Sequence, residues 1–393
     1  MMRFTLVSVL LHAFFLQLAV ALIRPTTSYI ALDLGATAVS LAWVVASFSV
    51  LPIVLAFPLG RMLDIGKEKP VLVVGALLML ATGPGLIFAA PNLTALSFWC
   101  TLLGLGHLMS LLSEQKRIAA GTVDHNRIFG IYTTSAAAAQ LLGPFLLGFI
   151  GGRSVTPDTT ALLVGYCAIV FSLLLVSLLM LRHPVVPSLA SRSPGGGIRR
   201  AFVTRPGVKG GLAASILISM LVLCAIDLLQ VYLPALAVER GMAVSEVGLL
   251  LAFRAAGTLV CRFGLGWLVY TIGRNRILVV SSGIAAALLA LVVVPMPLVS
   301  ALVLMFCLGL MLGIGQPLSM AMMSSYAPSD HLGTWLALRL TGSRAGQVLI
   351  PIGLSTFTIG AGAGGVLTGT ACLLLLSSLG SIRPLARLER NET

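Results

Sequence analysis

The segment Gly60-Arg61-Met62-Leu63-Asp64-Ile65-Gly66-Lys67 lies between two long apolar runs in the first half of the chain. A second short basic segment, Gly266-Trp267-Leu268-Val269-Tyr270-Thr271-Ile272-Gly273-Arg274-Asn275-Arg276, occupies the corresponding place in the second half. A basic loop that recurs between apolar segments indicates two related halves, each built from membrane helices.

The composition places the chain in a lipid bilayer. Of the 393 residues, 58% are hydrophobic and 9% are charged, and the mean hydropathy is +1.05. A water-soluble domain of this length does not bury so much apolar surface. The 41 glycines and 19 prolines are compatible with membrane helices, because neighbouring helices satisfy the backbone groups that proline leaves open. We therefore expect an integral membrane protein, located in the plasma (bacterial inner) membrane.

Apolar runs of about 20 residues cross the roughly 30 Å hydrocarbon core as helices, and the sequence predicts twelve of them. They are 5–30, 39–61, 71–91, 94–118, 129–152, 160–182, 209–236, 246–270, 276–296, 298–326, 332–358 and 362–382. The stretch between the sixth and seventh is rich in Pro, Ser and Gly, which is typical of a linker. The predicted organisation is an all-α membrane protein with six-helix bundles at 1–183 and 209–393, joined by a linker at 184–208.

The net charge of +13 follows from membrane topology. Most Lys and Arg lie at the termini, in the linker or in the loops that follow even-numbered spans. The opposite loops contain only two basic residues, Arg153 and Arg240. By the positive-inside rule, both termini and the linker are expected in the cytoplasm. Since topology explains the charge, no nucleic-acid partner is expected.

The sequence carries no signature of soluble catalysis. It has no nucleotide-binding Walker pattern and no Ser-His-Asp motif, and its six cysteines are scattered singly without ligand spacing. We therefore expect no enzyme activity, no catalytic residue, no metal and no cofactor. An ion gradient is the expected energy source for any transport.

The twelve spans, the central linker and the repeated loop resemble the major facilitator superfamily over essentially the whole chain. The loop signature of that family runs Gly-x-Leu-x-Asp-x-x-Gly-Arg-x-x-Arg. The second copy matches it at Gly266, Leu268, Gly273, Arg274 and Arg276, with Tyr270 in place of the acid. The first copy keeps Gly60 and Asp64, with Gly66 one residue early and Lys67 in place of the arginine. The acid thus survives only in the first half.

In this family the acid of the loop belongs to an inter-helix lock that holds the inside closed. The resemblance therefore assigns Asp64 to a cytoplasmic gate. Its candidate partners are Arg127 at the start of span 5 and the N-terminal end of span 11. Arg344, further along span 11, is also assigned to the gate. Gly60 and Gly266 are expected to permit close approach of another helix. The alternative for the basic residues of the first loop is that they only set the topology.

Span 5 resembles the motif Gly-x8-Gly-x3-Gly-Pro-x2-Gly-Gly of drug:proton antiporters. The matching residues are Gly130, Gly143, Pro144 and Gly148, while Ala139 and Leu147 replace two glycines. Small residues on one face permit tight helix packing, and Pro144 bends the helix. In that branch the bend is associated with export, so the resemblance favours efflux. Ordinary Gly/Pro helix packing is the alternative.

Charged and polar side chains within the spans mark candidate substrate sites, because they are costly in hydrocarbon. Arg24 in span 1 is the candidate for recognising an anion, unless it snorkels outward. Asp227 in span 7 and Arg254 in span 8 lie at similar depth, either as a pair that binds a proton or cation or as a structural pair. His107 in span 4 and Gln316 in span 10 are either ligands or interhelical hydrogen-bond partners.

Span 4 departs from a related proton-transfer pattern that has Arg four residues before a Gly. The segment Leu103-Gly104-Leu105-Gly106 matches, but Cys100 occupies the arginine position. A proton relay must therefore use other groups. Glu114, near the inner end of this span, is interpreted as an interfacial residue beside Lys116 and Arg117.

Together these features predict a secondary transporter that moves a small organic solute by alternating access, as a proton-coupled exporter. One alternative is an importer of a small organic anion, and another is a non-transporting membrane sensor. The expected partners are the solute, protons and membrane lipid, and the protein is expected to be a monomer.

Overall fold

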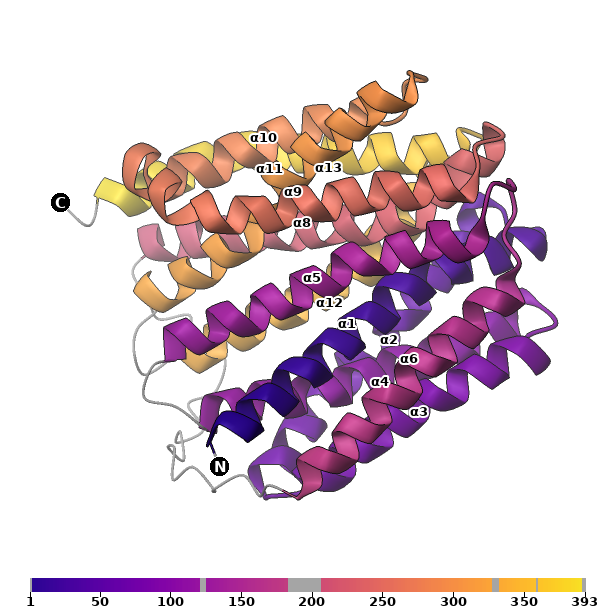
Figure 1. Cartoon of the computed structure of the whole chain (residues 1–393). Coiled ribbons are helices and arrows are strands. Elements are labelled where there is room, and N and C mark those ends of the chain that lie inside the picture. Colours follow the sequence, from indigo (N-terminus) through magenta and orange to yellow (C-terminus); the bar gives the residue numbers. More distant parts are fainter. Residues whose placement is uncertain (1, 121–124, 183–205, 327–331, 358–359, 391–393) are drawn as a thin grey trace. The chain divides into compact units, whose positions relative to one another are not determined.

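The structure is a computed structural model that describes residues 2–120, 125–182, 206–326, 332–357 and 360–390. The side chain of Asp64 and those of several residues beside the gaps lie outside this description. The described residues form twelve α-helices and no strand, which confirms the predicted fold class (Figure 1).

The helices follow the predicted spans closely. In chain order they are α1 (Met2–Asp33), α2 (Ala38–Asp64), α3 (Glu68–Phe88), α4 (Leu93–Ala120), α5 (His125–Gly151), α6 (Thr159–Leu181), α8 (Pro206–Glu239), α9 (Val244–Ile272), α10 (Arg274–Leu291), α11 (Leu298–Tyr326), α12 (Leu332–Phe357) and α13 (Gly362–Arg390). The clearest difference is at α13, which continues through Pro384 beyond its predicted end at residue 382.

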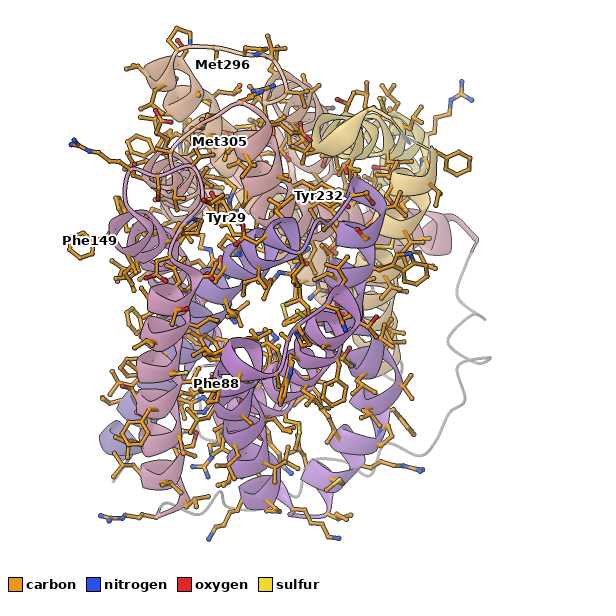
Figure 2. The ribbon with its side chains drawn as sticks, turned by 90° about the vertical axis from the view of Figure 1, so that its right-hand side faces the viewer. Tyr29, Phe88, Phe149, Tyr232, Met296 and Met305 are labelled. Atoms are coloured by element: carbon orange, nitrogen blue, oxygen red, sulfur yellow. The ribbon has the colours of Figure 1, made fainter. Side chains whose placement is uncertain are left out.

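The helices have the length and surface of membrane spans. Judged over the described residues, eleven of the twelve, all except α12, are long and apolar enough to cross a membrane. Large apolar side chains lie on the surface: Phe88 is 85% exposed, Phe149 86% and Phe357 91%. Figure 2 shows Phe149 projecting outward from its helix. Such a surface is unfavourable in water and suited to hydrocarbon, so the chain is an integral membrane protein.

The chain divides into two compact units. Unit 1 comprises Met1–Leu189 and Gln230–Ala252, and unit 2 comprises Ala190–Leu229 and Phe253–Thr393. In unit 1, α1 packs against α4, α5 and α6, while α4 also packs against α2 and α3. In unit 2, α10 packs against α11 and α13. Residues 184–205 of the predicted linker lie outside the described part, and the predicted bundle boundaries stay a prediction.

Glycines allow the closest helix contacts in both units. A Cβ at Gly104 of α4 would lie 1.8 Å from the Phe48 carbonyl oxygen of α2. In unit 2, a Cβ at Gly309 of α11 would lie 1.9 Å from the Arg254 carbonyl oxygen of α9. No side chain fits at such distances, so the second and fourth helices of each half touch through their backbones.

We expect Gly104→Ala and Gly309→Ala to lower stability, because the new methyl group forces these helix pairs apart. Overpacking of this kind costs about 1–3 kcal/mol, which lowers the thermal midpoint of the purified protein in detergent. The matched control is Gly380→Ala, since a Cβ there meets no heavy atom within 4 Å. Equal midpoints for Gly104→Ala and Gly380→Ala would contradict the close contact.

Candidate functional site

Each copy of the repeated loop turns at a glycine with a positive φ. After α2 the chain turns through Gly66 with φ at +85°, and after α9 it turns through Gly273 with φ at +90°. Only glycine adopts this left-handed conformation without strain. The loop glycines are therefore required by the backbone of the turn.

The expected close helix packing at Gly60 and Gly266 is not seen among the described residues and stays a prediction. A Cβ added at either position would have no heavy atom within 4 Å among the described residues. Neither glycine is therefore in tight contact with the described residues.

The predicted gate is described only in part. Lys67 and Arg276 are exposed, and Arg274 is partly buried. The side chains of Asp64 and Arg127 lie outside the described residues, so the gate at Asp64 stays a prediction.

Arg24 and His107 are brought together in unit 1 by an aromatic ring. The Arg24 guanidinium lies 4.7 Å from the centre of the Phe48 ring, a cation–π distance. The His107 ring lies 5.6 Å from the same ring. Arg24 and His107 are both buried. Arg24 therefore does not snorkel out of unit 1, and it faces a site formed by α1, α2 and α4.

Cys100 belongs to the same region. It is buried on α4, and both the charge of Arg24 and the hydroxyl of Thr27 act on its thiol. Span 1 thus supplies a positive charge beside the position where the proton-transfer pattern has an arginine in span 4.

A second polar cluster joins α8, α9 and α12 in unit 2. The Gln347 Nε2 donates to Asp227 Oδ2, and the Arg344 Nη1 donates to Gln347 Oε1 over 3.1 Å. Asp227 also acts electrostatically on Arg254 of α9. Arg344 was predicted to join the cytoplasmic gate, but the structure gives it a partner in this buried cluster.

Arg254 is the most enclosed charge of this cluster. Its side chain is 1% exposed, and its Nε and Nη2 atoms have no hydrogen-bond partner among the described residues. Its backbone is fixed, because Thr258 Oγ1 donates to the carbonyls of Arg254 and Gly309 over 3.2 and 3.1 Å. A buried guanidinium with unused donors favours an anionic partner.

Gln316 lies in a neighbouring set of hydrogen bonds. Its Nε2 donates to the Ser219 carbonyl over 2.6 Å, and its Oε1 accepts from Arg339 Nη1 over 2.9 Å. Arg339 Nη1 also donates to Ser219 Oγ over 3.2 Å. Gln316 thus makes interhelical hydrogen bonds between α8, α11 and α12, which was the second of its two predicted roles.

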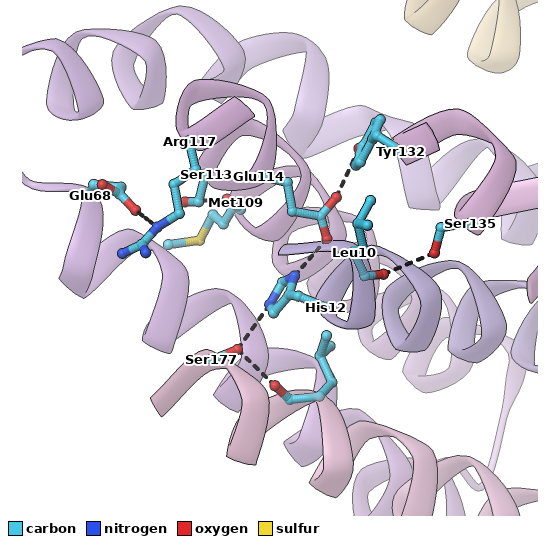
Figure 3. A network of polar contacts seen from close by, with 11 residues as sticks. Leu10, His12, Glu68, Met109, Ser113, Glu114, Arg117, Tyr132, Ser135 and Ser177 are labelled. Atoms are coloured by element: carbon cyan, nitrogen blue, oxygen red, sulfur yellow. Dashed lines mark hydrogen bonds and ion pairs between the residues drawn. The ribbon is translucent and has the colours of Figure 1, made fainter. Parts of the chain in front are cut away.

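The most enclosed polar network lies in unit 1 and was not predicted. His12 of α1 places Nδ1 2.5 Å from Glu114 Oε1 and Nε2 2.9 Å from Ser177 Oγ of α6 (Figure 3). Tyr132 of α5 donates its hydroxyl to Glu114 Oε2 over 2.8 Å. The interpretation of Glu114 as interfacial is wrong, because both His12 and Glu114 are 0% exposed. The network thus joins four helices, α1, α4, α5 and α6, around His12 and Glu114.

A signal for this network was present in the sequence. His12 interrupts an apolar run in span 1, and Glu114 follows one in span 4, where each polar side chain is costly unless it is paired. Pairing them requires knowing that α1 and α4 pack together, which the periodicity of single spans does not reveal.

A structural ion pair lies beside this network. The Arg117 Nε donates to Glu68 Oε1 (Figure 3). The Arg117 Nη1 donates to the Met180 carbonyl over 2.9 Å. Both side chains are buried. The pair connects α4, α3 and α6 and balances its own charge.

The small residues of span 5 face two helices. A Cβ at Gly143 would lie 2.5 Å from Ala21 Cβ of α1, and one at Gly148 would lie 3.2 Å from Ser245 of α9. A Cβ at Gly248 of α9 would lie 2.6 Å from the Pro144 carbonyl oxygen. The motif therefore holds α5 tightly against α1 and the first part of α9. The surroundings of Gly130 lie outside the part of the chain that the structure describes.

Comparison with known proteins identifies the family. The sequence profile of the Major Facilitator Superfamily matches residues 9–351. The chain therefore belongs to the major facilitator superfamily and is a membrane transporter of that class. No curated protein sequence matches the chain.

Solved structures share its fold at low sequence identity. The D-xylose-proton symporter is 16% identical with a TM-score of 0.75, and 98% of each chain is covered. The xylose transporter XylE from E. coli, in its inward open conformation, is 14% identical with a TM-score of 0.74, covering 97% of this chain and 95% of that one. The nucleoside transporter NupG is 13% identical with a TM-score of 0.72, covering 99% of both.

We expect Glu68→Gln to destabilise the protein by about 3 kcal/mol, because it leaves the Arg117 guanidinium buried without its carboxylate. The thermal midpoint in detergent measures the loss. The double variant Glu68→Gln/Arg117→Gln removes both charges and should recover much of it. A single variant as stable as the wild type would show that the pair contributes no stability.

Proposed function

We propose that this chain is a secondary transporter that exports a small organic anion in exchange for protons by alternating access. The observation that carries the proposal is the excess of positive charge in the interior of unit 2, together with the unused donors of Arg254.

The charge balance of unit 2 favours an anionic solute. Asp227 is its only acidic residue whose side chain is described. Five arginines of its helices are buried or partly buried: Arg254, Arg262, Arg274, Arg339 and Arg344. Charges inside a membrane protein are costly unless they are paired. A carboxylate or phosphate of a bound solute would offset part of this excess.

Unit 1 offers a second recognition surface of mixed character. Arg24 supplies a cation, and the rings of Phe48 and His107 supply an aromatic face beside it. A solute that combines an anionic group with an aromatic or apolar body matches this arrangement.

The proposed direction of transport rests on span 5. The resemblance of its motif to drug:proton antiporters favours export, and Gly143 and Gly148 have the tight helix contacts that such a motif implies. Import is the second candidate. It is favoured by the fold shared with a D-xylose-proton symporter, whereas the helix packing of small residues is compatible with either direction.

A two-stage experiment tests the proposal. First, the purified protein is screened for thermal stabilisation by panels of organic anions, cations and neutral solutes. The anions that stabilise it are then assayed in proteoliposomes of known protein orientation with an imposed pH gradient. Uphill movement of an anion toward the side predicted to be extracellular supports export, and the opposite direction supports import. An absence of flux with every panel would contradict transport of such solutes.

We expect Arg254→Gln to reduce anion flux by about tenfold to a hundredfold, because one charge-assisted hydrogen bond contributes about 1.5–3 kcal/mol. Initial rates in proteoliposomes measure the effect. The control is Arg153→Gln, which removes an exposed loop arginine and should leave the rate unchanged. Equal rates for both variants would remove Arg254 from the substrate site.

A further inference from the structure

The His12–Glu114 pair differs from two other buried charged contacts of unit 1, Arg117 with Glu68 and Arg24 with Phe48. Arg117 and Glu68 balance each other with fixed charges, and Arg24 is a permanent cation. Both members of the His12–Glu114 pair carry groups that exchange protons with water when they are exposed to it. The pair is also fully enclosed, so a change in its protonation changes the charge of the interior.

The hydrogen bonds of Ser177 fix which nitrogen of His12 carries a proton. Ser177 Oγ donates its only hydrogen to the Leu173 carbonyl over 2.8 Å. It therefore accepts from His12, so Nε2 is the donor in the 2.9 Å contact. The ring nitrogen that faces Glu114 is then Nδ1.

The contact between Nδ1 and Glu114 holds one shared proton. At 2.5 Å, two atoms with only lone pairs would repel each other, so a hydrogen lies between them. Two arrangements satisfy this: an imidazolium beside a carboxylate, or a neutral imidazole beside a carboxylic acid. Both have zero net charge and the same number of protons. The proton therefore belongs to the pair.

Removing that proton while the contact is closed is unfavourable. It would leave a net negative charge in the interior and two lone pairs facing each other, with the Tyr132 hydroxyl as the donor to Oε2. The neighbouring charges do not offset it. Arg117 on the same helix is bonded to Glu68 of α3, and Lys116 donates to the Leu63 carbonyl of α2.

The other helices around the pair contribute no further charge from their described residues. Tyr132 is the titratable group from α5, and the side chains of α5 before Ile131 lie outside the description. From α6 the pair meets the neutral Ser177. The proton is thus retained until α1 and α4 separate enough to admit water.

We propose that the His12–Glu114 pair is the site that carries the coupled proton. When the contact opens, the shared proton passes to water, which leaves neutral His12 and the Glu114 carboxylate. Before the contact closes again, a proton from the other aqueous phase restores the neutral pair. This assignment rests on the proposed proton-coupled function and replaces Asp227 as the proton carrier. Asp227 stays in contact with Gln347 and near Arg254.

The proton itself is the probe for the first test. Infrared difference spectra of the full chain in lipid nanodiscs, recorded between acidic and alkaline pH, detect carboxyl and imidazole groups that change protonation. We expect a signal from an enclosed carboxyl–imidazole pair that is lost in both Glu114→Gln and His12→Gln. The matched control Asp227→Asn should keep it. A signal that survives in Glu114→Gln, or disappears in Asp227→Asn, would overturn the assignment.

Tyr132→Phe provides a variant that keeps both members of the pair. It removes the hydroxyl that stabilises the deprotonated carboxylate, so the midpoint of the same signal should rise by about one pH unit. An unchanged midpoint would contradict the proposed geometry. This measurement decides the matter even if Glu114→Gln does not fold.

Transport then separates this assignment from the proposed function. Glutamine at position 114 can donate to Nδ1 as the shared proton does, so Glu114→Gln should keep exchange of an anion identified by the screen. The accumulation of that anion driven by a pH gradient should be at least tenfold lower than in the wild type. Retained accumulation would contradict the proton site. If the wild type moves no solute, the proposed function fails, while the infrared result still decides whether the pair binds the proton.

Discussion

The structure depends on one constraint: hydrocarbon offers no hydrogen-bond partner, so buried polar groups must find partners inside the protein. In unit 1 this constraint pairs Glu114 with His12 and Glu68 with Arg117. In unit 2 it places Gln347 against Asp227. Each pairing connects helices that are far apart in the sequence. The polar side chains thus specify which helices lie together, a choice that apolar packing alone leaves open.

The same positions serve packing and recognition in both units. Phe48 and Arg254 lie the same number of residues before Gly60 and Gly266. Each offers its carbonyl to a glycine of the fourth helix of its half, Gly104 or Gly309. Their side chains have diverged: the Phe48 ring lies under Arg24, whereas Arg254 supplies the buried charge itself. The internal repeat therefore fixes the backbone geometry, and each half fills it with different chemistry.

Much of the fold could be predicted, because apolar runs, basic loops and breakers report directly on membrane helices. The residues at which single helices carry an unusual charge were also recognisable, as Arg24, Asp227 and Arg254 show. Partners were harder to predict. Arg344 was assigned to the gate and Glu114 to the interface from their places along one helix. Their contacts with Gln347 and His12 depend on how the helices pack, which one sequence does not encode in its periodicity.

The central claim is that unit 1 holds one proton between His12 and Glu114. The most direct measurement is the 15N magnetic resonance spectrum of histidine-labelled protein in lipid, with the His12 signals identified among the 5 histidines by their loss in His12→Gln. The account predicts a protonated Nε2, and an Nδ1 whose resonance shows a proton shared with Glu114. A neutral His12 with its hydrogen on Nδ1 and an unprotonated Nε2 would contradict it.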